Sequence, residues 1–247
     1  VKDEEIRQQL LAMTDAEKED AFYRDLEFGT AGLRGVIAAG TNRMNIYTVG
    51  KASQGLANYI VKNFPEEERK AAIAYDSRIK SDVFSKVTAG VLAANGIKVY
   101  IYKELEPVPL CSYATRELHC CAGVMVTASH NPSKYNGYKV YGPDGCQCTT
   151  EYANAVLAEI EKTDTFKDVK KLDFEEGLKS GIIEYIDDSM LTNFLEAVKT
   201  QSLVGDAEID KNVAIVYSPL NGTGLIPVTR ILKETGYTNI TVVKEQE

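Results

Sequence analysis

The sequence predicts an α/β fold in which helices flank a layered, mixed, largely parallel sheet. Apolar strand patterns and amphipathic helix patterns alternate along most of the chain, with short connections, and this alternation is typical of strand–helix–strand units. Polar clusters directly follow two predicted strands, at residues 76–78 and 128–132. Ligands of open α/β sheets collect at the carboxyl ends of strands, so the same pattern also predicts where a site would lie.

The N-terminal part of the chain begins with a helical pattern over residues 4–27, broken and capped at Thr14-Asp15, which predicts an arm laid on the core. Residues 28–35 hold three glycines and predict a turn. The elements expected next are a helix at 48–64, a strand at 71–75, a helix at 83–94, a strand at 98–102, a helix at 107–118 and a strand at 122–127. Asn136-Gly137 then predicts a turn, and a strand at 138–141 returns along the sheet and makes it mixed.

The C-terminal part predicts a first domain over residues 1–201 and the start of a second, similar domain over 202–247. The first domain is expected to end with a helix at 151–162, loop and irregular pieces at 163–180, a strand at 182–186 and a helix at 187–200 capped by Asp187 or Asp188. After a polar, acidic stretch come a strand at 213–217, a helix at 225–235 and a strand at 240–243. A unit of about 40 residues is too small to be stable alone, so it packs on the first domain or belongs to an incomplete second one.

The composition is that of an ordinary globular protein, with 44% hydrophobic and 26% charged residues among 247. The net charge of −8 disfavours nucleic acid and anionic membranes as partners. The charged N-terminus lacks the apolar core of a secretory signal and no run reaches membrane-spanning length, so we expect a cytoplasmic protein. The five cysteines include no C-x-x-C pair, and we expect free, mostly buried thiols in preference to a zinc site.

The stretch from Cys121 to Gly145 carries the chemistry. An apolar strand stops abruptly at Ala128-Ser129-His130-Asn131-Pro132, and the proline holds the backbone there in a turn. Ser129 can carry a covalent group, while His130 or Lys139 can move a proton to or from a substrate oxygen. The alternative interpretation is a surface serine in an Asn-Pro turn, because turn residues also have purely local reasons to occur.

About twenty consecutive residues here, TASHNPSKYNGYKVYGPDG, resemble the active-site loop of the α-D-phosphohexomutases, the family of phosphoglucomutases and phosphomannomutases. The resemblance implies a phosphoserine at Ser129 and a general base or acid at Lys139, with His130 the less favoured candidate. FGTAGLRG resembles the family's N-terminal signature and implies that Arg34 helps to hold a phosphorylated ligand. YDSR also resembles a family segment, in which Asp76 and Arg78 either contact ligand or pair with each other.

The resemblance further implies Mg²⁺, bound to a phosphate oxygen on Ser129 and to aspartates of a D-G-D-x-D-R-like loop that this sequence does not contain. It implies a small sugar phosphate as substrate, whose phosphate moves between C1 and C6 or C5 through a bisphosphate, and a sugar 1,6-bisphosphate as activator. The missing loop, Val1 in place of methionine and the end at Glu247 agree with an N-terminal portion of such a mutase, inactive alone. The arm and GTAGLRG are more similar to the phosphoglucomutase and phosphopentomutase branch.

Two other functions compete with this interpretation. A serine hydrolase needs an elbow such as G-x-S-x-G and a base held by an acid, and Ala128-Ser129-His130 supplies neither in that form. A non-catalytic sugar-phosphate-binding module is compatible with the absence of the metal loop. Ser218 to Gly224 resembles the opening of the family's second domain, with Asn221 where a histidine is common. The sequence leaves the sugar and the oligomeric state open.

Overall fold

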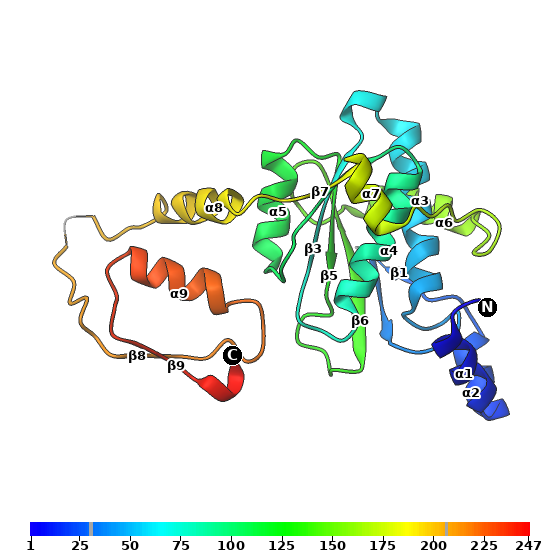
Figure 1. Cartoon of the computed structure of the whole chain (residues 1–247), viewed down its shortest axis with the longest axis horizontal. Coiled ribbons are helices and arrows are strands. Elements are labelled where there is room, and N and C mark those ends of the chain that lie inside the picture. The colour runs from blue at the N-terminus through cyan, green and yellow to red at the C-terminus, as the bar shows by residue number, and fades with distance from the viewer. Residues whose placement is uncertain (30–31, 206) are drawn as a thin grey trace.

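The computed structural model describes residues 1–29, 32–205 and 207–247. The helices are α1 (Glu4–Ala12), α2 (Asp15–Phe22), α3 (Ile46–Asn63), α4 (Ser81–Ala94), α5 (Val108–Glu117), α6 (Thr150–Glu161), α7 (Phe174–Ser180), α8 (Ser189–Lys199) and α9 (Leu225–Glu234). The strands are β1 (Phe28–Gly29), β2 (Gly32–Val36), β3 (Lys70–Tyr75), β4 (Lys98–Ile101), β5 (Ala122–Val126), β6 (Tyr135–Tyr141), β7 (Ile183–Tyr185), β8 (Ile215–Tyr217) and β9 (Ile240–Val242). Figure 1 shows their arrangement.

A seven-stranded sheet in the order β1-β2-β6-β5-β3-β4-β7 forms the centre of the larger unit. Strands β5, β3, β4 and β7 run parallel to one another. Strand β6 then pairs antiparallel with β5 and with β2, and β2 pairs antiparallel with β1. The predicted mixed sheet flanked by helices is therefore confirmed, with the antiparallel strands gathered on one side of β5.

Helices cover both faces of this sheet (Figure 1). On one face α3, α4 and α6 pack over a large apolar core that includes Leu56, Phe84 and Tyr138, each fully buried. On the other face α5 and α8 cover a smaller core that includes Ala74, Leu110 and Met125. Strand residues alternate between the two faces, which is why adjacent Tyr138 and Lys139 belong to different sides of the sheet.

The glycine-rich segment at 28–35 does not form only the turn that its composition predicts. Its described residues are strand residues of β1 and β2, and β2 pairs along its whole length with β6. Thr30 and Ala31 lie outside the described residues. The glycines mislead a local prediction because Gly32 and Gly35 are needed for close packing: a Cβ on Gly32 would lie 1.7 Å from the Tyr138 carbonyl oxygen.

The prediction of a turn at Asn136-Gly137 is wrong, because both residues lie inside β6. Asn136 is fully buried and its Nδ2 donates to the Ile79 carbonyl and to Ser81 Oγ. Gly137 lies so close to its neighbours that a Cβ would be 2.5 Å from the Thr127 carbonyl oxygen. Tertiary contacts therefore account for a dipeptide that is otherwise a strong turn signal.

The prediction of irregular structure at 163–180 is wrong over its second half, where α7 forms. Asp173 caps this helix by accepting a hydrogen bond from the Glu176 backbone N–H, and Gly181 ends it in a left-handed conformation. Only Gly177 is buried among its residues, where it packs on Ile183. Phe174 and Leu178 also pack against the core but are only partly buried. A helix of seven residues has too few apolar positions to display a clear helical period.

The C-terminal residues form a smaller unit in which β8 and β9 pair in parallel and α9 connects them. Figure 1 shows α8 leading from the larger unit toward it. Two side-chain contacts join α9 to α8: Arg230 donates to Thr192 Oγ1 at 2.8 Å, and Lys199 pairs with Glu234 at 3.0 Å. The division into domains at residues 201 and 202 stays a prediction. In the described ranges no helix is both long and apolar enough to cross a membrane.

Candidate active site

Ser129 lies on the loop that joins β5 to β6, residues 127–134, which we call the serine loop; the residue is exposed. Its backbone has φ +54°, in the left-handed region, which costs a non-glycine residue about 1–2 kcal/mol. The Ser129 backbone N–H donates to Thr127 Oγ1 at 2.9 Å, and this bond helps to hold the bend. The loop therefore presents the serine hydroxyl outward at the carboxyl end of a parallel strand, where the sequence predicts it.

His130 is also exposed, and its Nδ1 lies 3.4 Å from Ser129 Oγ. That distance is at the long limit of a hydrogen bond. No carboxylate of the described residues pairs with the imidazole of His130 by hydrogen bond or ion pair. A hydrolase triad needs such an acid to orient the base, so the geometry gives the hydrolase alternative no support.

Lys139 and Arg34 lie on one face of the sheet. Lys139 pairs in register with Met125 on β5, while Arg34 on β2 pairs with Gly137, two residues before Lys139 on β6. Directly paired residues and residues two apart point to the same side, so both cations share the Met125 side. The Thr127 backbone N–H donates to the Gly137 carbonyl at 3.1 Å, which places Arg34 one strand away from the start of the serine loop.

Neither cation is neutralised by a neighbour. Within the described part of the chain, the side chains of Arg34 and Lys139 make no hydrogen bond or ion pair; Arg34 is exposed and Lys139 is half-buried. The structure thus places an exposed serine and two cations at one end of the sheet, while the role predicted for each stays a prediction.

A cleft of about 680 Å³ opens beside the serine loop. Its walls come from four segments: residues 76–79 after β3, residues 107–109 at the start of α5, the serine loop, and residues 220–223 of the C-terminal unit. Met125 and Thr127 line it, which shows that it lies on the same side of the sheet as Lys139 and Arg34. Ser77 Oγ donates to the Asn221 carbonyl at 2.6 Å and joins the two units at the cleft.

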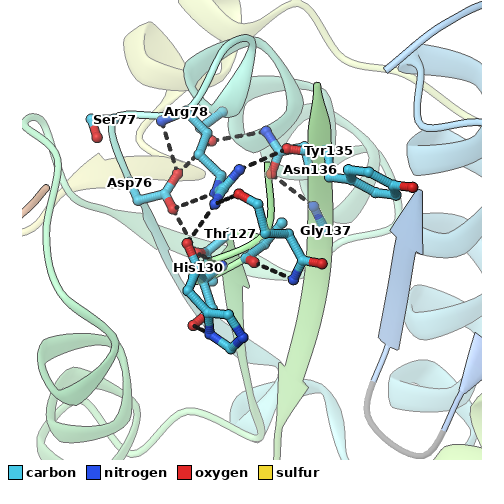
Figure 2. Close-up of polar contacts among 12 residues, drawn as sticks. Asp76, Ser77, Arg78, Thr127, His130, Tyr135, Asn136 and Gly137 are labelled. Atoms are coloured by element: carbon cyan, nitrogen blue, oxygen red, sulfur yellow. Dashed lines mark hydrogen bonds and ion pairs between the residues drawn. The ribbon is translucent and has the colours of Figure 1, made fainter. Parts of the chain in front are cut away.

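Asp76 and Arg78 pair with each other, which is one of the two interpretations of YDSR; both also line the cleft, so their contact with a ligand stays a prediction. Arg78 Nε lies 3.6 Å from Asp76 Oδ2, and the two side chains are 12% and 14% exposed. Asp76 also accepts hydrogen bonds from Thr127 Oγ1 and from Ser81 Oγ. Figure 2 shows Asp76 beside Arg78, with the Arg78 side chain extending toward the backbone of the loop that carries His130.

The described side chains do not by themselves fit a magnesium ion. Among them no group of three or more histidine, cysteine, aspartate or glutamate residues is placed to hold a metal. Asp76, the carboxylate that lines the cleft with Ser129, has its oxygens engaged by Thr127, Ser81 and the Arg78 backbone N–H. The prediction that a phosphate oxygen on Ser129 is a metal ligand is therefore not tested by these residues.

The cysteines give no sign of a second reactive centre. Cys111, Cys120 and Cys121 are buried and all five thiols are free. Burial raises the pKa of Cys111 and Cys120 to about 12. A thiol reacts as its thiolate, so these side chains act as small apolar core residues, as predicted.

Comparison with known proteins identifies the family. The family model described as "Phosphoglucomutase/phosphomannomutase, alpha/beta/alpha domain I" matches residues 25–167, more than half of the chain. The chain belongs to this family. The match spans the β1–β6 strands, the serine loop and both predicted cations, so the family predicted from the loop sequence is confirmed.

Curated phosphohexomutase relatives match nearly the whole chain. A phosphoglucomutase from Staphylococcus saprophyticus is 36% identical over 233 residues, which cover 94% of this chain and 41% of the relative. A phosphoribomutase from Saccharomyces cerevisiae is 36% identical over 224 residues, which cover 87% of this chain and 36% of the relative. The chain thus spans well under half the length of the curated relatives that it matches.

Solved structures share the phosphohexomutase fold. One from Thermus thermophilus has a TM-score of 0.73 at 24% identity and covers 90% of this chain and 46% of its own. A phosphoglucomutase/phosphomannomutase family protein from Burkholderia thailandensis has a TM-score of 0.63 at 20% identity, covering 87% and 43%. At these identities the likeness concerns the fold.

Sequence reasoning missed two parts of the site. The Arg78 side chain donates hydrogen bonds to backbone carbonyls of the serine loop, and backbone carbonyls carry no sequence signal. The approach of residues 220–223 to the cleft depends on how the C-terminal unit packs, although the glycines of Ser218 to Gly224 indicate a loop that can come close to a partner. The contact there uses the Asn221 backbone carbonyl, which any residue provides.

Proposed function

We propose that this chain supplies the phosphoryl-carrying half of a phosphosugar mutase. Ser129 holds the phosphoryl group, Arg34 steadies phosphate, and Lys139, or less favourably His130, moves the proton of the sugar hydroxyl. One observation carries the proposal: an exposed serine on a strained loop opens on a cleft on the sheet side to which Arg34 and Lys139 also point.

The transfer follows from those roles. The oxygen of a sugar hydroxyl forms a bond to phosphorus while the bond from phosphorus to Ser129 Oγ breaks, and the hydroxyl proton passes to Lys139 or His130. The product is a sugar bisphosphate. After it reorients in the cleft, its other phosphoryl group returns to Ser129 Oγ and the released sugar oxygen takes the proton back. Positive side chains that face the phosphate stabilise the charge on its oxygens during both transfers.

The substrate is proposed to be a hexose or pentose monophosphate, with a sugar 1,6-bisphosphate as activator. Relatives are named phosphoglucomutase and phosphoribomutase, which supports a sugar phosphate without choosing between the two sugars. The cleft volume of about 680 Å³ accommodates a ligand of that size. Magnesium, a cytoplasmic location and the absence of nucleic-acid and membrane partners stay predictions.

Phosphorylation of Ser129 tests the proposal directly. The whole protein that contains this chain is incubated with glucose 1,6-bisphosphate and Mg²⁺, and the phosphoryl group is located by intact mass and peptide mapping. We expect one phosphoryl group on Ser129 and none in Ser129→Ala, while Ser133→Ala, an exposed serine of the same loop, serves as the matched control. Phosphate at Ser133 or at no residue would contradict the assignment.

Mutase turnover is measured on the whole protein that contains this chain, with glucose 1-phosphate and ribose 1-phosphate as competing substrates. Lys139→Met is expected to lower kcat by roughly 100-fold or more, within the range attributed to a general acid or base. Lys134→Met is its control, because Lys134 is exposed on the serine loop and lies over the Tyr135 ring. Equal losses in the two variants would remove Lys139 from the proposal.

A further inference from the structure

We propose that Arg78, with Asp76 and Thr127, is a positioning unit that sets the backbone of Ser129 and turns the carbonyl oxygens of the serine loop away from the phosphate. The inference rests on the proposed function only for the identity of that phosphate. The geometry itself concerns a single guanidinium and the loop that surrounds it (Figure 2).

The Arg78 guanidinium donates hydrogen bonds to four backbone carbonyls of the serine loop and the start of β6. Nη1 donates to the carbonyls of Pro132 and Tyr135, each at 3.1 Å. Nη2 donates to the carbonyls of Ser129 and Asn131. An arginine has five N–H donors in a rigid planar fork, so the loop carbonyls must converge on one plane. No other residue type can hold four carbonyls in this way.

Both peptide groups of Ser129 are tied to the same ion pair. Its carbonyl accepts from Arg78, while its N–H donates to Thr127 Oγ1, which in turn donates to Asp76 Oδ2. Asp76 faces Arg78 Nε at 3.6 Å and accepts from the Arg78 backbone N–H at 3.0 Å. Fixing the groups on either side of a residue fixes its φ and ψ, so this closed circuit holds Ser129 in the left-handed region.

The same hydrogen bonds also determine the electrostatic surroundings of a phosphate on Ser129. Carbonyl oxygens carry partial negative charge and repel an anion. Since four of them point at Arg78, they do not face the hydroxyl side of the loop. Arg78 lines the cleft with Ser129, but it is 12% exposed, its positive charge is opposed by Asp76 and its two Nη atoms donate to four carbonyls. We therefore assign Arg78 to the loop and not to the phosphate. We assign attraction for the anion to Arg34 and Lys139, which lie on the same side of the sheet as the cleft.

A matched arginine lies at the opposite end of the same strand. Arg69 immediately precedes β3, and its guanidinium also donates to backbone carbonyls, those of Phe64 at 3.0 Å and Val61 at 3.1 Å. Arg69→Lys therefore removes a carbonyl-holding fork of the same kind far from the serine loop. Arg69→Lys therefore measures the effect of losing such a fork on the fold alone, and the effect of Arg78→Lys is compared with it.

The test reads the Ser129 backbone directly. In serine-selective ¹⁵N-labelled protein, a residue with positive φ gives a strong intraresidue NOE between its amide and α protons. We expect this NOE at Ser129 in the wild-type chain and in Arg69→Lys, and its loss in Arg78→Lys and Thr127→Val. Thr127→Ser keeps the hydroxyl and should restore it. Far-UV circular dichroism confirms that each variant is folded.

The same variants are then made in the whole protein that contains this chain and are phosphorylated with glucose 1,6-bisphosphate. We expect the rate at Ser129 to fall roughly 100-fold in Arg78→Lys and Thr127→Val, the scale of loss when a reacting group is displaced by about 1 Å, and to be nearly unchanged in Arg69→Lys and Thr127→Ser. A persistent positive-φ NOE in folded Thr127→Val and Arg78→Lys would overturn the inference. If the NOE behaves as expected but wild-type protein takes up no phosphoryl group, the positioning unit stands and the proposed function fails.

Discussion

Gly137→Ala is expected to disturb the serine loop and the sheet together. Gly137 lies in β6 between β2 and the end of β5, on the side of the sheet that carries Arg34 and Lys139. A Cβ built on it would lie 2.5 Å from the Thr127 carbonyl oxygen and 3.0 Å from the Leu33 carbonyl oxygen. Both obstacles are backbone atoms of neighbouring segments, so no side-chain rotation relieves them.

The magnitude follows from the size of that clash. Cβ contacts shorter than 3.0 Å essentially do not occur, so the serine loop must move by several tenths of an ångström. Inserting a methyl group into a packed region costs about 1–3 kcal/mol, and the reduced entropy of the unfolded chain returns about 0.4–1 kcal/mol. The central values of these two ranges give a net destabilisation of about 1 kcal/mol, or roughly 2–4 °C in Tm.

Thermal unfolding followed by far-UV circular dichroism measures the stability change, and the phosphorylation assay measures the effect at Ser129. Gly50→Ala is the control, because a Cβ there meets only the Val169 Cγ1 atom at 3.4 Å and other side-chain atoms at 3.8 Å or more. In the middle of α3 that alanine should stabilise the protein by about 0.5–1 kcal/mol. If Gly137→Ala matched wild type in Tm and in the rate of Ser129 phosphorylation, the close approach of β6 to Thr127 would be refuted.

Two further predictions concern buried polar groups. Burial, together with the charges of Asp188 and Glu104, raises the pKa of Glu106 from its usual 4.5 to about 7. Between these two pH values the folded state keeps the proton that the unfolded state has released. The free energy of unfolding therefore falls as the pH rises from 4.5 through 7. Because the carboxyl is partly exposed and screened, Glu106→Gln should remove a loss of about 1 kcal/mol between pH 5 and pH 8, and parallel urea-unfolding profiles would contradict this. Tyr138→Phe should cost about 1 kcal/mol, since its hydroxyl accepts from buried Ser53 at 3.3 Å, whereas Tyr152→Phe should be neutral or stabilising, since its buried hydroxyl has no partner among the described residues; equal shifts in urea midpoint would refute the contrast.

The order of strands and helices was predictable because each element has its own local signal. The α3 and α4 helices carry apolar faces with the helical period, and β3 and β5 are short apolar runs bounded by polar clusters. Where the local signal was misleading, packing had overridden it. Gly32 and Gly137 serve close strand approach, and a glycine chosen for lack of space looks the same in a sequence as one chosen for a turn.

The site divides in the same way. Ser129, Lys139 and Arg34 could be proposed from the sequence because a hydroxyl, an amine and a guanidinium belong to the residue types themselves; their roles stay predictions. That Arg34 and Lys139 point to one side of the sheet depends on the register of β2 on β6, which a single sequence does not contain. The Arg78 contacts could not be predicted from the sequence, since their acceptors are backbone oxygens that every residue possesses.

An acidic protein that binds a phosphate needs cations that are not neutralised by its own carboxylates. The net charge of this chain is −8, and many lysines and arginines are paired with carboxylates, as Lys80 is with Glu5 and Lys98 with Glu184. Arg78, which lines the cleft, is opposed by Asp76. Arg34 and Lys139 lie on the same side of the sheet without lining the cleft, and they have no acidic partner among the described residues. The left-handed Ser129 costs about 1–2 kcal/mol, and charged hydrogen bonds of about 1.5–3 kcal/mol each from one neutralised arginine more than offset it. Under the proposed function, a neutralised cation thus holds the loop without competing for the phosphate, and Arg34 and Lys139 are the cations proposed to attract it.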